Sequence, residues 1–135
     1  MNYCEYFADL ARDAFPECAV YSNVDPTREW NGTPTLEFNE PDEPTTRGFL
    51  SGFALTTRTL YMIARAATTT GAEELASRLY DFAVSRASAL QASGAVRAWS
   101  IANAGTSSDV RGIVEGESFY GYLEITLTER TKNGC

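Results

Sequence analysis

A chain of 135 residues, 44% of them hydrophobic and 21% charged, is long enough for one compact domain with its own core, and this composition excludes wholesale disorder. The formal net charge of −7 and the pI near 4.5 argue against nonspecific nucleic-acid binding, which depends on lysine and arginine neutralising phosphates. No apolar run approaches the roughly 20 residues that span a bilayer, so an integral membrane protein is not expected.

The sequence has no histidine and three cysteines, Cys4, Cys18 and Cys135. Without histidine the commonest general base and the commonest metal ligand are missing, and the cysteines lack metal-ligand spacing. We therefore expect no metal and no cofactor. We expect Cys4 and Cys18 to be buried or half-buried thiols of a reduced, intracellular protein rather than a disulfide. A nucleophilic Cys4 would need a base that the sequence does not offer.

The first segment, Tyr3 to Phe15, predicts an amphipathic helix that ends at Pro16. A short strand over Ala19–Ser22 follows, and then an irregular turn from Asn23 to Thr33. Thr35–Asn39 alternates apolar and polar residues and is predicted as a second strand. The residues of the helix that fall near helical spacing are Tyr3, Tyr6, Phe7, Leu10, Ala14 and Phe15.

Two prolines and three acids occur between Glu40 and Thr46, which predicts a stiff, exposed loop carrying Glu40, Asp42 and Glu43. The next segment, Gly52–Arg65, is rich in β-branched and aromatic residues and is predicted to be the central strand. The residues that share one face of this strand are Phe53, Leu55, Thr57, Thr59, Tyr61 and Ile63.

Thr70, with Glu73 three residues later, predicts a capping box at the start of a long helix. This helix is expected to run to about Ala92 and to stop at Gly94, because glycine best tolerates the left-handed cap conformation. Its predicted apolar stripe consists of Leu75, Leu79, Phe82 and Leu90 with the alanines at 76, 83 and 87.

The remaining chain predicts strands separated by polar turns. Ala95–Asn103 alternates ambiguously and is predicted as a strand, Gly105–Gly112 as a polar loop, and Ile113–Val114 as a short strand piece. The last strand, Glu117–Arg130, has the clearest pattern of all. Thr131–Cys135 is predicted to be a frayed tail.

Alternation along the last strand predicts a sheet with two different faces. Its apolar residues are Phe119, Leu123, Ile125 and Leu127; between them lie Tyr120, Tyr122, Glu124, Thr126 and Thr128. Successive side chains of a strand point to opposite faces, so one face meets a core and the other is polar, threonine-rich and aromatic. The order of elements predicts a single α+β domain, a mainly antiparallel sheet with two helices packed on one face.

Carboxylates are the remaining candidates for chemistry. A glycosidase-like pair needs two carboxylates at a fixed separation on rigid elements, whereas Glu37, Glu40, Asp42 and Glu43 are interpreted as a solvated acidic loop. Asp109 and Arg111 indicate either an ion pair at a site or an ordinary surface turn. No catalytic residue is predicted.

Four residues near the last strand are candidates for contacts with other chains. Glu115 and Glu117 either bind arginines of a partner or are ordinary charges at a strand end. Tyr120 and Tyr122 either pack half-buried against a loop or lie at a subunit interface, where tyrosine is enriched. The sequence leaves both alternatives open.

The order and texture of these elements resemble a known family. The amphipathic helix is followed by a proline-bearing strand segment (TPTLEFNEP), a long strand (LTTRTLYMIARA), an Ala-x-x-Leu-Ala-x-x-Leu helix over Ala72–Leu79, and a closing strand with Gly-Tyr-x-x-x-x-Leu over Gly121–Leu127. This succession resembles the tail terminator and minor capsid (neck) proteins of long-tailed bacteriophages.

The resemblance implies a structural virion protein of the tail or neck, assembled in the host cytoplasm as a hexameric ring. Such a ring would end polymerisation of the tail tube and dock the tail to the head. The implied partners are further copies of the chain, the tail tube protein and the head-tail connector protein. DNA would pass through the hole without specific binding, with which an acidic chain agrees.

On this interpretation, the acidic loop with Glu40, Asp42 and Glu43 and the loop Thr106–Arg111 are expected to protrude and contact neighbours. Neutralising the three acids together is expected to leave the fold intact. Three alternatives remain: another connector or completion protein of the neck, a small-ligand binding domain whose pocket is lined by Trp30 and Trp99, and an enzyme that uses carboxylates held inside the fold.

Overall fold

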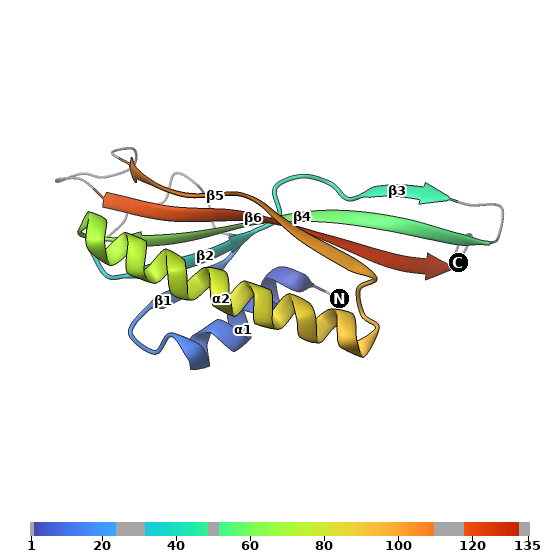
Figure 1. Cartoon of the computed structure of the whole chain (residues 1–135), viewed down its shortest axis with the longest axis horizontal. Coiled ribbons are helices and arrows are strands. Elements are labelled where there is room, and N and C mark those ends of the chain that lie inside the picture. The colour runs from blue at the N-terminus through green and yellow to red at the C-terminus, as the bar shows by residue number, and fades with distance from the viewer. Residues whose placement is uncertain (1, 24–31, 49–51, 110–117, 133–135) are drawn as a thin grey trace.

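The computed structural model describes residues 2–23, 32–48, 52–109 and 118–132. Its elements are α1 (Tyr3–Ala14), β1 (Ala19–Ser22), β2 (Thr35–Asn39), β3 (Thr45–Gly48), β4 (Phe53–Ala66), α2 (Thr69–Ser93), β5 (Ala98–Asp109) and β6 (Ser118–Lys132). The described strands form one sheet, and both helices lie on the same side of it (Figure 1). The predicted α+β fold with a mainly antiparallel sheet is confirmed.

Strands β4 and β6 form the centre of the sheet. Each of the 14 residues of β4 has a partner in β6, from Phe53 opposite Lys132 to Ala66 opposite Phe119. β5 pairs with the other side of β6, and β2 pairs with the other side of β4. β1 runs parallel to β2 at the border, which is the one parallel pairing among the described strands.

Strand β3 was not predicted, and it continues the line of β2. Both are antiparallel to β4, but β2 pairs with Tyr61–Arg65 and β3 with Ala54–Thr57. The chain between them, residues 40–44, is therefore a break in the line of strands that pairs with this side of β4. Its two prolines explain the break, because proline has no N–H to donate to a ladder.

Helix α1 begins and ends close to its predicted bounds. The side chain of Asn2 accepts a hydrogen bond from the N–H of Glu5, and Phe15 caps the other end. The buried side is rotated from the predicted stripe, because Leu10 is half-buried and Ala14 is exposed. The residues that α1 buries are Tyr3, Cys4, Phe7, Ala8 and Ala11.

The predicted start of α2 was wrong. Its N-cap is Thr68, whose hydroxyl accepts from the N–H of Gly71 at 3.0 Å, so Thr70 and Glu73 do not form the cap. The predicted stop at Gly94 is confirmed. Gly94 has φ +86°, and its N–H bonds the carbonyls of Gln91 and Leu90.

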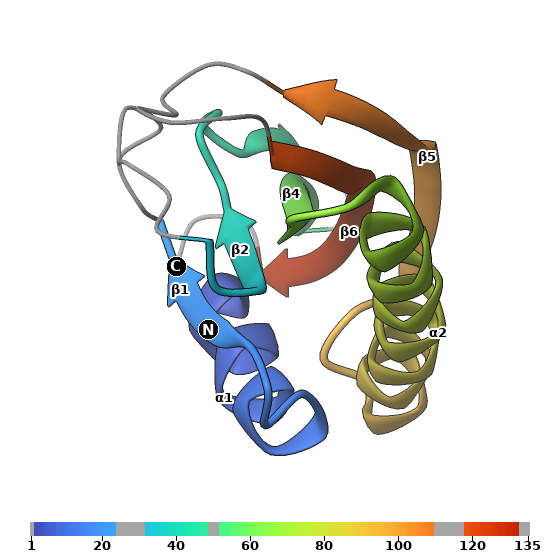
Figure 2. The same ribbon diagram turned by 90° about the vertical axis from the view of Figure 1, so that its left-hand side faces the viewer.

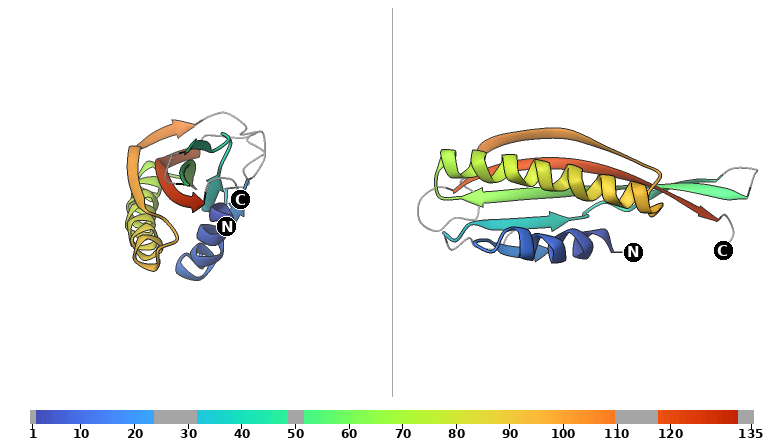
Figure 3. Two further views of the ribbon diagram at one scale, coloured as in Figure 1. Left: turned by 90° about the vertical axis from the view of Figure 1, so that its right-hand side faces the viewer. Right: turned by 60° about the horizontal axis from the view of Figure 1, so that its bottom comes forward.

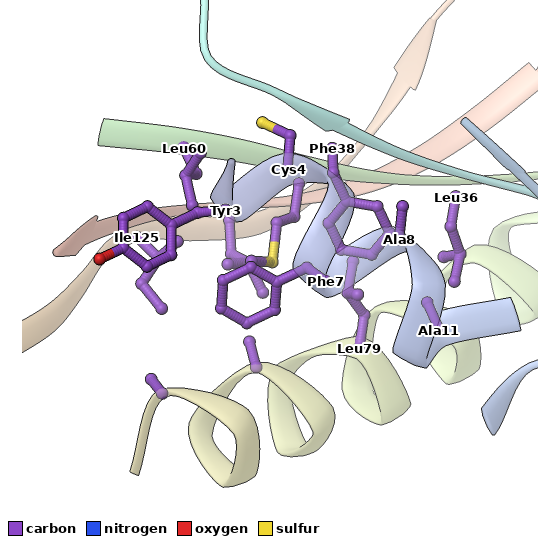
Figure 4. Packing of buried hydrophobic residues seen from close by; sticks show 14 of the residues in the cluster. Tyr3, Cys4, Phe7, Ala8, Ala11, Leu36, Phe38, Leu60, Leu79 and Ile125 are labelled. Carbon is purple, nitrogen blue, oxygen red and sulfur yellow. The ribbon is translucent and has the colours of Figure 1, made fainter. Parts of the chain in front are cut away.

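Phenylalanines join the two helices to the sheet. The ring of Phe7 in α1 stacks on Phe38 of β2 at 6.3 Å, and Phe82 of α2 lies 6.4 Å from Phe7 and 6.5 Å from Phe38. Figure 4 shows Phe7 and Phe38 among the buried side chains, with Leu60 and Ile125 contributed by the two central strands. Full burial of such a side chain contributes about 1.5–3 kcal/mol, so this layer holds the helices on the sheet.

The β4 residues predicted to share a face do so, and it is the face away from the helices; the core side carries Leu60, Met62 and Ala64. Two further predictions about strands are corrected. The predicted loop Gly105–Gly112 is strand as far as Asp109, after a bulge between Ala102 and Gly105. β6 extends to Lys132, beyond the predicted start of the frayed tail. Ile113–Val114 lies outside the described residues.

Helix α2 lies very close to β6 at Gly121. A Cβ atom placed on Gly121 would lie 2.2 Å from the Cβ of Ala76 and 3.3 Å from the carbonyl oxygen of Ala72. Real Cβ contacts are never that short, so the helix can sit at this depth only over glycine. Small residues on both elements thus set the distance between the layers.

Gly121→Ala is therefore expected to lower the free energy of unfolding by about 1–3 kcal/mol, because α2 has to move away from β6. Chemical denaturation measures the loss. Adding Ala76→Gly, which alone costs about 1 kcal/mol in a helix, is expected to recover part of it. A Gly121→Ala protein as stable as the wild type would contradict this packing.

Candidate functional site: the open face and the arm

The side of the sheet away from the helices carries the aromatic and threonine side chains predicted from the sequence. We call it the open face. Leu123, Ile125 and Leu127 are buried under the helices, so the alternating residues Tyr120 and Tyr122 lie on the open face. Tyr122 is 37% exposed and Tyr120 is half-buried, with their ring centroids 6.0 Å apart. The predicted alternation of β6 is confirmed.

The open face changes in character along the strands. At one end, Arg65 lies opposite Tyr120, Ile63 opposite Tyr122 and Tyr61 opposite Glu124. Threonines then follow on both strands, at 57 and 59 in β4 and at 126 and 128 in β6. At the far end the register aligns Arg47, Leu55 and Arg130 across three strands.

This far end extends beyond both helices. We call it the arm, and it consists of β3, residues 53–57 of β4 and residues 128–132 of β6 (Figure 1). The right-hand view of Figure 3 shows it continuing past the helices. Phe53 is 37% exposed, and the guanidinium of Arg130 lies 3.9 Å from its ring centroid, a cation–π contact. The arm thus presents apolar and cationic groups together.

Glu37 on the open face is held in an ion pair. It is only 8% exposed, and its Oε2 accepts from Nε of Arg65 at 2.7 Å. The same guanidinium lies 5.7 Å from the ring of Tyr120. A buried carboxylate without such a partner would be strongly unfavourable. The ion pair with Arg65 thus accounts for the buried position of Glu37.

Four polar side chains meet on the helix side where the arm leaves the body, and we call them the root cluster: Tyr3, Glu40, Arg58 and Glu129. Arg58 donates from Nη1 to Glu40 at 3.2 Å and from Nε to Glu129 at 3.4 Å, and the hydroxyl of Tyr3 donates to Glu129. The three charged side chains are 14–26% exposed. Burial, and then the hydrogen bond to Glu129, raise the pKa of Tyr3 above its usual value.

The predicted acidic loop divides into two parts. Asp42 and Glu43 are exposed, as expected, but Glu40 belongs to the root cluster, so the prediction that all three acids protrude was wrong. Asp42 accepts from the hydroxyl of Tyr61 at 3.4 Å. The charge of Glu124, followed by lost hydration and the charge of Asp42, raises the pKa of Tyr61. Neutralising all three acids is therefore expected to destabilise the fold, because Arg58 would lose its contact with Glu40.

The other predicted site residues lie at the end of β5, on the core side, or outside the described residues. The backbone of Asp109 ends β5 opposite Ser118, so the described part of the loop Thr106–Arg111 is strand. Arg111, Glu115 and Glu117 lie outside the described residues, as does Trp30. Trp99 is half-buried against the core under the helices.

The cysteines are placed as structural thiols. Cys4 is fully buried and Cys18 half-buried, and both are free. Burial raises the pKa of Cys4 to about 12 and that of Cys18 to about 11, which leaves little thiolate near neutral pH. Among the described residues, no three His, Cys, Asp or Glu side chains gather as a metal site. No helix within those residues is long and apolar enough to cross a membrane.

Comparison with known proteins adds no relative: neither a protein-family model nor a curated protein matches the chain.

The root cluster predicts that removing Glu40 lowers the free energy of unfolding more than removing its neighbours Asp42 and Glu43. Glu40→Ala is expected to lower the free energy of unfolding by about 1–3 kcal/mol, because Arg58 loses a charged hydrogen-bond partner. The matched control, Asp42→Ala with Glu43→Ala, removes two exposed acids and is expected to change stability by less than about 0.5 kcal/mol. Thermal or chemical denaturation compares the two proteins. Equal effects would contradict the cluster.

The raised pKa values of the two thiols predict that they react slowly with disulfide reagents. In a Cys135→Ser protein, Cys4 and Cys18 are expected to react with a disulfide reagent at pH 8 on the order of 100-fold more slowly than in the unfolded chain. Because only the thiolate reacts, the rate should rise as the pH is raised. Rapid reaction of Cys4 in the folded protein at pH 7 would contradict its burial.

Proposed function

We propose that this protein is a structural subunit that assembles with further copies into a closed ring. The observation that carries the proposal is the arm, a three-stranded extension of the sheet that projects beyond the helices and displays Phe53 and Arg130. Exposed apolar groups on a protruding element are typical of surfaces that contact other proteins. On the open face, Tyr122 is also exposed, and tyrosine is common at interfaces.

The lengths of the elements explain why an arm exists. A strand of 14 residues spans about 46 Å, whereas a helix of 25 residues spans about 38 Å. Helix α2 starts at one end of β4 and runs back along it, so it ends before β4 does (Figure 3). The uncovered end is rigid because its strands are paired, which suits a contact that has to be repeated from copy to copy.

The positions of the described carboxylates are better explained by structural ion pairs than by catalysis. Glu37 is paired with Arg65, and Glu40 and Glu129 share Arg58. A carboxylate that accepts from a guanidinium is oriented by that partner, as in structural ion pairs of many proteins. These pairs favour an assembly protein over an enzyme.

The place of the ring is a further part of the proposal: the head-proximal end of the tail tube of a long-tailed phage. There it would end tube polymerisation and dock the tail to the head connector, as a tail terminator in the virion neck. The resemblance supports this assignment, since the elements that carry it occur as α1, β2, β4, α2 and β6 in the expected order. The net charge of −7 suits a channel that passes DNA without holding it. The arm equally fits another neck protein.

The solution mass tests this proposal. Light scattering of the purified protein over a wide concentration range is expected to give six times the mass of one chain, or a monomer that forms rings only when tail tubes are added. Tubes of an unrelated phage serve as the matched control. A monomer indifferent to concentration and to tubes would contradict the proposal, and rings without affinity for tubes would favour a connector or completion protein.

A further inference from the structure

The described sheet has two border strands, β3 and β5, that could pair with further strands. At the arm, β3 pairs with β4 alone, and all four of its residues are exposed. On the opposite side, β5 pairs with β6 alone along Ala98–Asp109. A border strand presents a row of N–H and C=O groups that can pair with another chain. Figure 2 shows β5 at one margin of the sheet.

Strand β5 lacks most of the features that prevent a border strand from pairing with another chain. Natural proteins block such edges with lysine or other charges, with proline, with bulges or with very short strands. The 12 residues of β5 include no lysine, arginine, glutamate or proline; the only charged residue is Asp109, at the end. One bulge, between Ala102 and Gly105, is the only such feature in the strand. β5 is thus a long edge suited to accept a strand.

Charge distinguishes the arm from the rest of the molecule. The arm strands contain Arg47, Arg130 and Lys132 and one acid, Glu129, which is held in the root cluster. Their formal charge is +2, and since the whole chain carries −7, the other residues carry −9. A contact between two arms or between two bodies therefore brings like charges together. An arm on a body brings opposite charges together, which favours that pairing and speeds encounter.

We propose that copies of this chain associate head to tail by continuing the sheet, with β3 of one arm pairing with β5 of the next copy. β3 borders β4 in the arm, and β5 borders β6 along the body, so the two edges lie on opposite sides of the β4–β6 pair. Each pairing then leaves a free β3 at one end and a free β5 at the other. Such a heterologous contact repeats until it closes on itself or grows into a filament. This inference rests on the self-assembly part of the proposed function and does not depend on the phage tail.

Crosslinking with single cysteines tests the pairing directly. Thr45 and Ser100 are exposed, and their partners Thr57 and Thr126 place both on the open face, so paired strands would bring them close. In a Cys18→Ser and Cys135→Ser background, Thr45→Cys protein is mixed with differently tagged Ser100→Cys protein and oxidised mildly. We expect mixed disulfide dimers only. A chain with both changes should give a ladder of multimers on a nonreducing gel.

The matched control places the cysteine elsewhere. Ser77→Cys, on the exposed side of α2, replaces Ser100→Cys and is expected to give no mixed dimer. Disulfides between two Ser100→Cys chains, or between two Thr45→Cys chains, would show like-with-like pairing and overturn the inference. A sixfold mass without the mixed crosslink would overturn the inference and leave the ring standing. A ladder of crosslinked multimers without closed rings would support the pairing of β3 with β5 and contradict the ring. A protein that stays monomeric would overturn both the pairing and the ring.

The charge argument has its own measurement. Arg130→Glu is expected to weaken association about tenfold, because it replaces attraction between the arm and an acidic body by repulsion. Arg86→Glu makes the same change of charge on α2 and is expected to have little effect. Equal weakening by both would overturn the arm as the contact.

Discussion

The ladder between β4 and β6 is the constraint on which the rest of the molecule depends. It fixes which residues of both strands face the helices and which face outward, because a slip by one residue would exchange the two sets. Leu60 with Ile125 then lies under the helices, and Tyr61 with Glu124 on the open face. The same ladder is longer than the helical layer, so the body and the arm are parts of one rigid unit.

The root cluster fixes the arm at the point where that layer ends. Its members come from the first residue of α1, the break after β2, and both central strands. Arg58 stands in the series of β4 residues that otherwise points into the core, so its charge has to be neutralised there. Glu40 and Glu129 supply the opposite charge, and the hydroxyl of Tyr3 donates to Glu129. The cluster therefore gives a structural reason for Glu40, which the sequence had assigned to an interface.

Elements with strong local patterns were predictable from sequence, and long-range pairings were not. The alternation of β6 predicted its two faces correctly, and the proline after α1 predicted where that helix ends to within a residue. β3 was missed because the two prolines just before it dominate the local pattern, while its pairing partner in β4 lies later in the chain. The core side of β4 was hidden because Thr56 and Arg58 interrupt its apolar series. For the candidate site, Tyr120 and Tyr122 followed from alternation, but no local signal joins Glu40 to Arg58 and Glu129.

Among the described strands, the one that completes the sheet is the last to be synthesised. β6 follows β4, α2 and β5 in the chain, yet it lies between β4 and β5. While α2 and β5 emerge from the ribosome, one edge of β4 has no strand partner, and β5 has none until β6 follows. Folding of the sheet is therefore delayed until β6 has emerged, and these edges are exposed to aggregation during that interval. Loss of even a few C-terminal residues of β6 would shorten the ladder first at the arm.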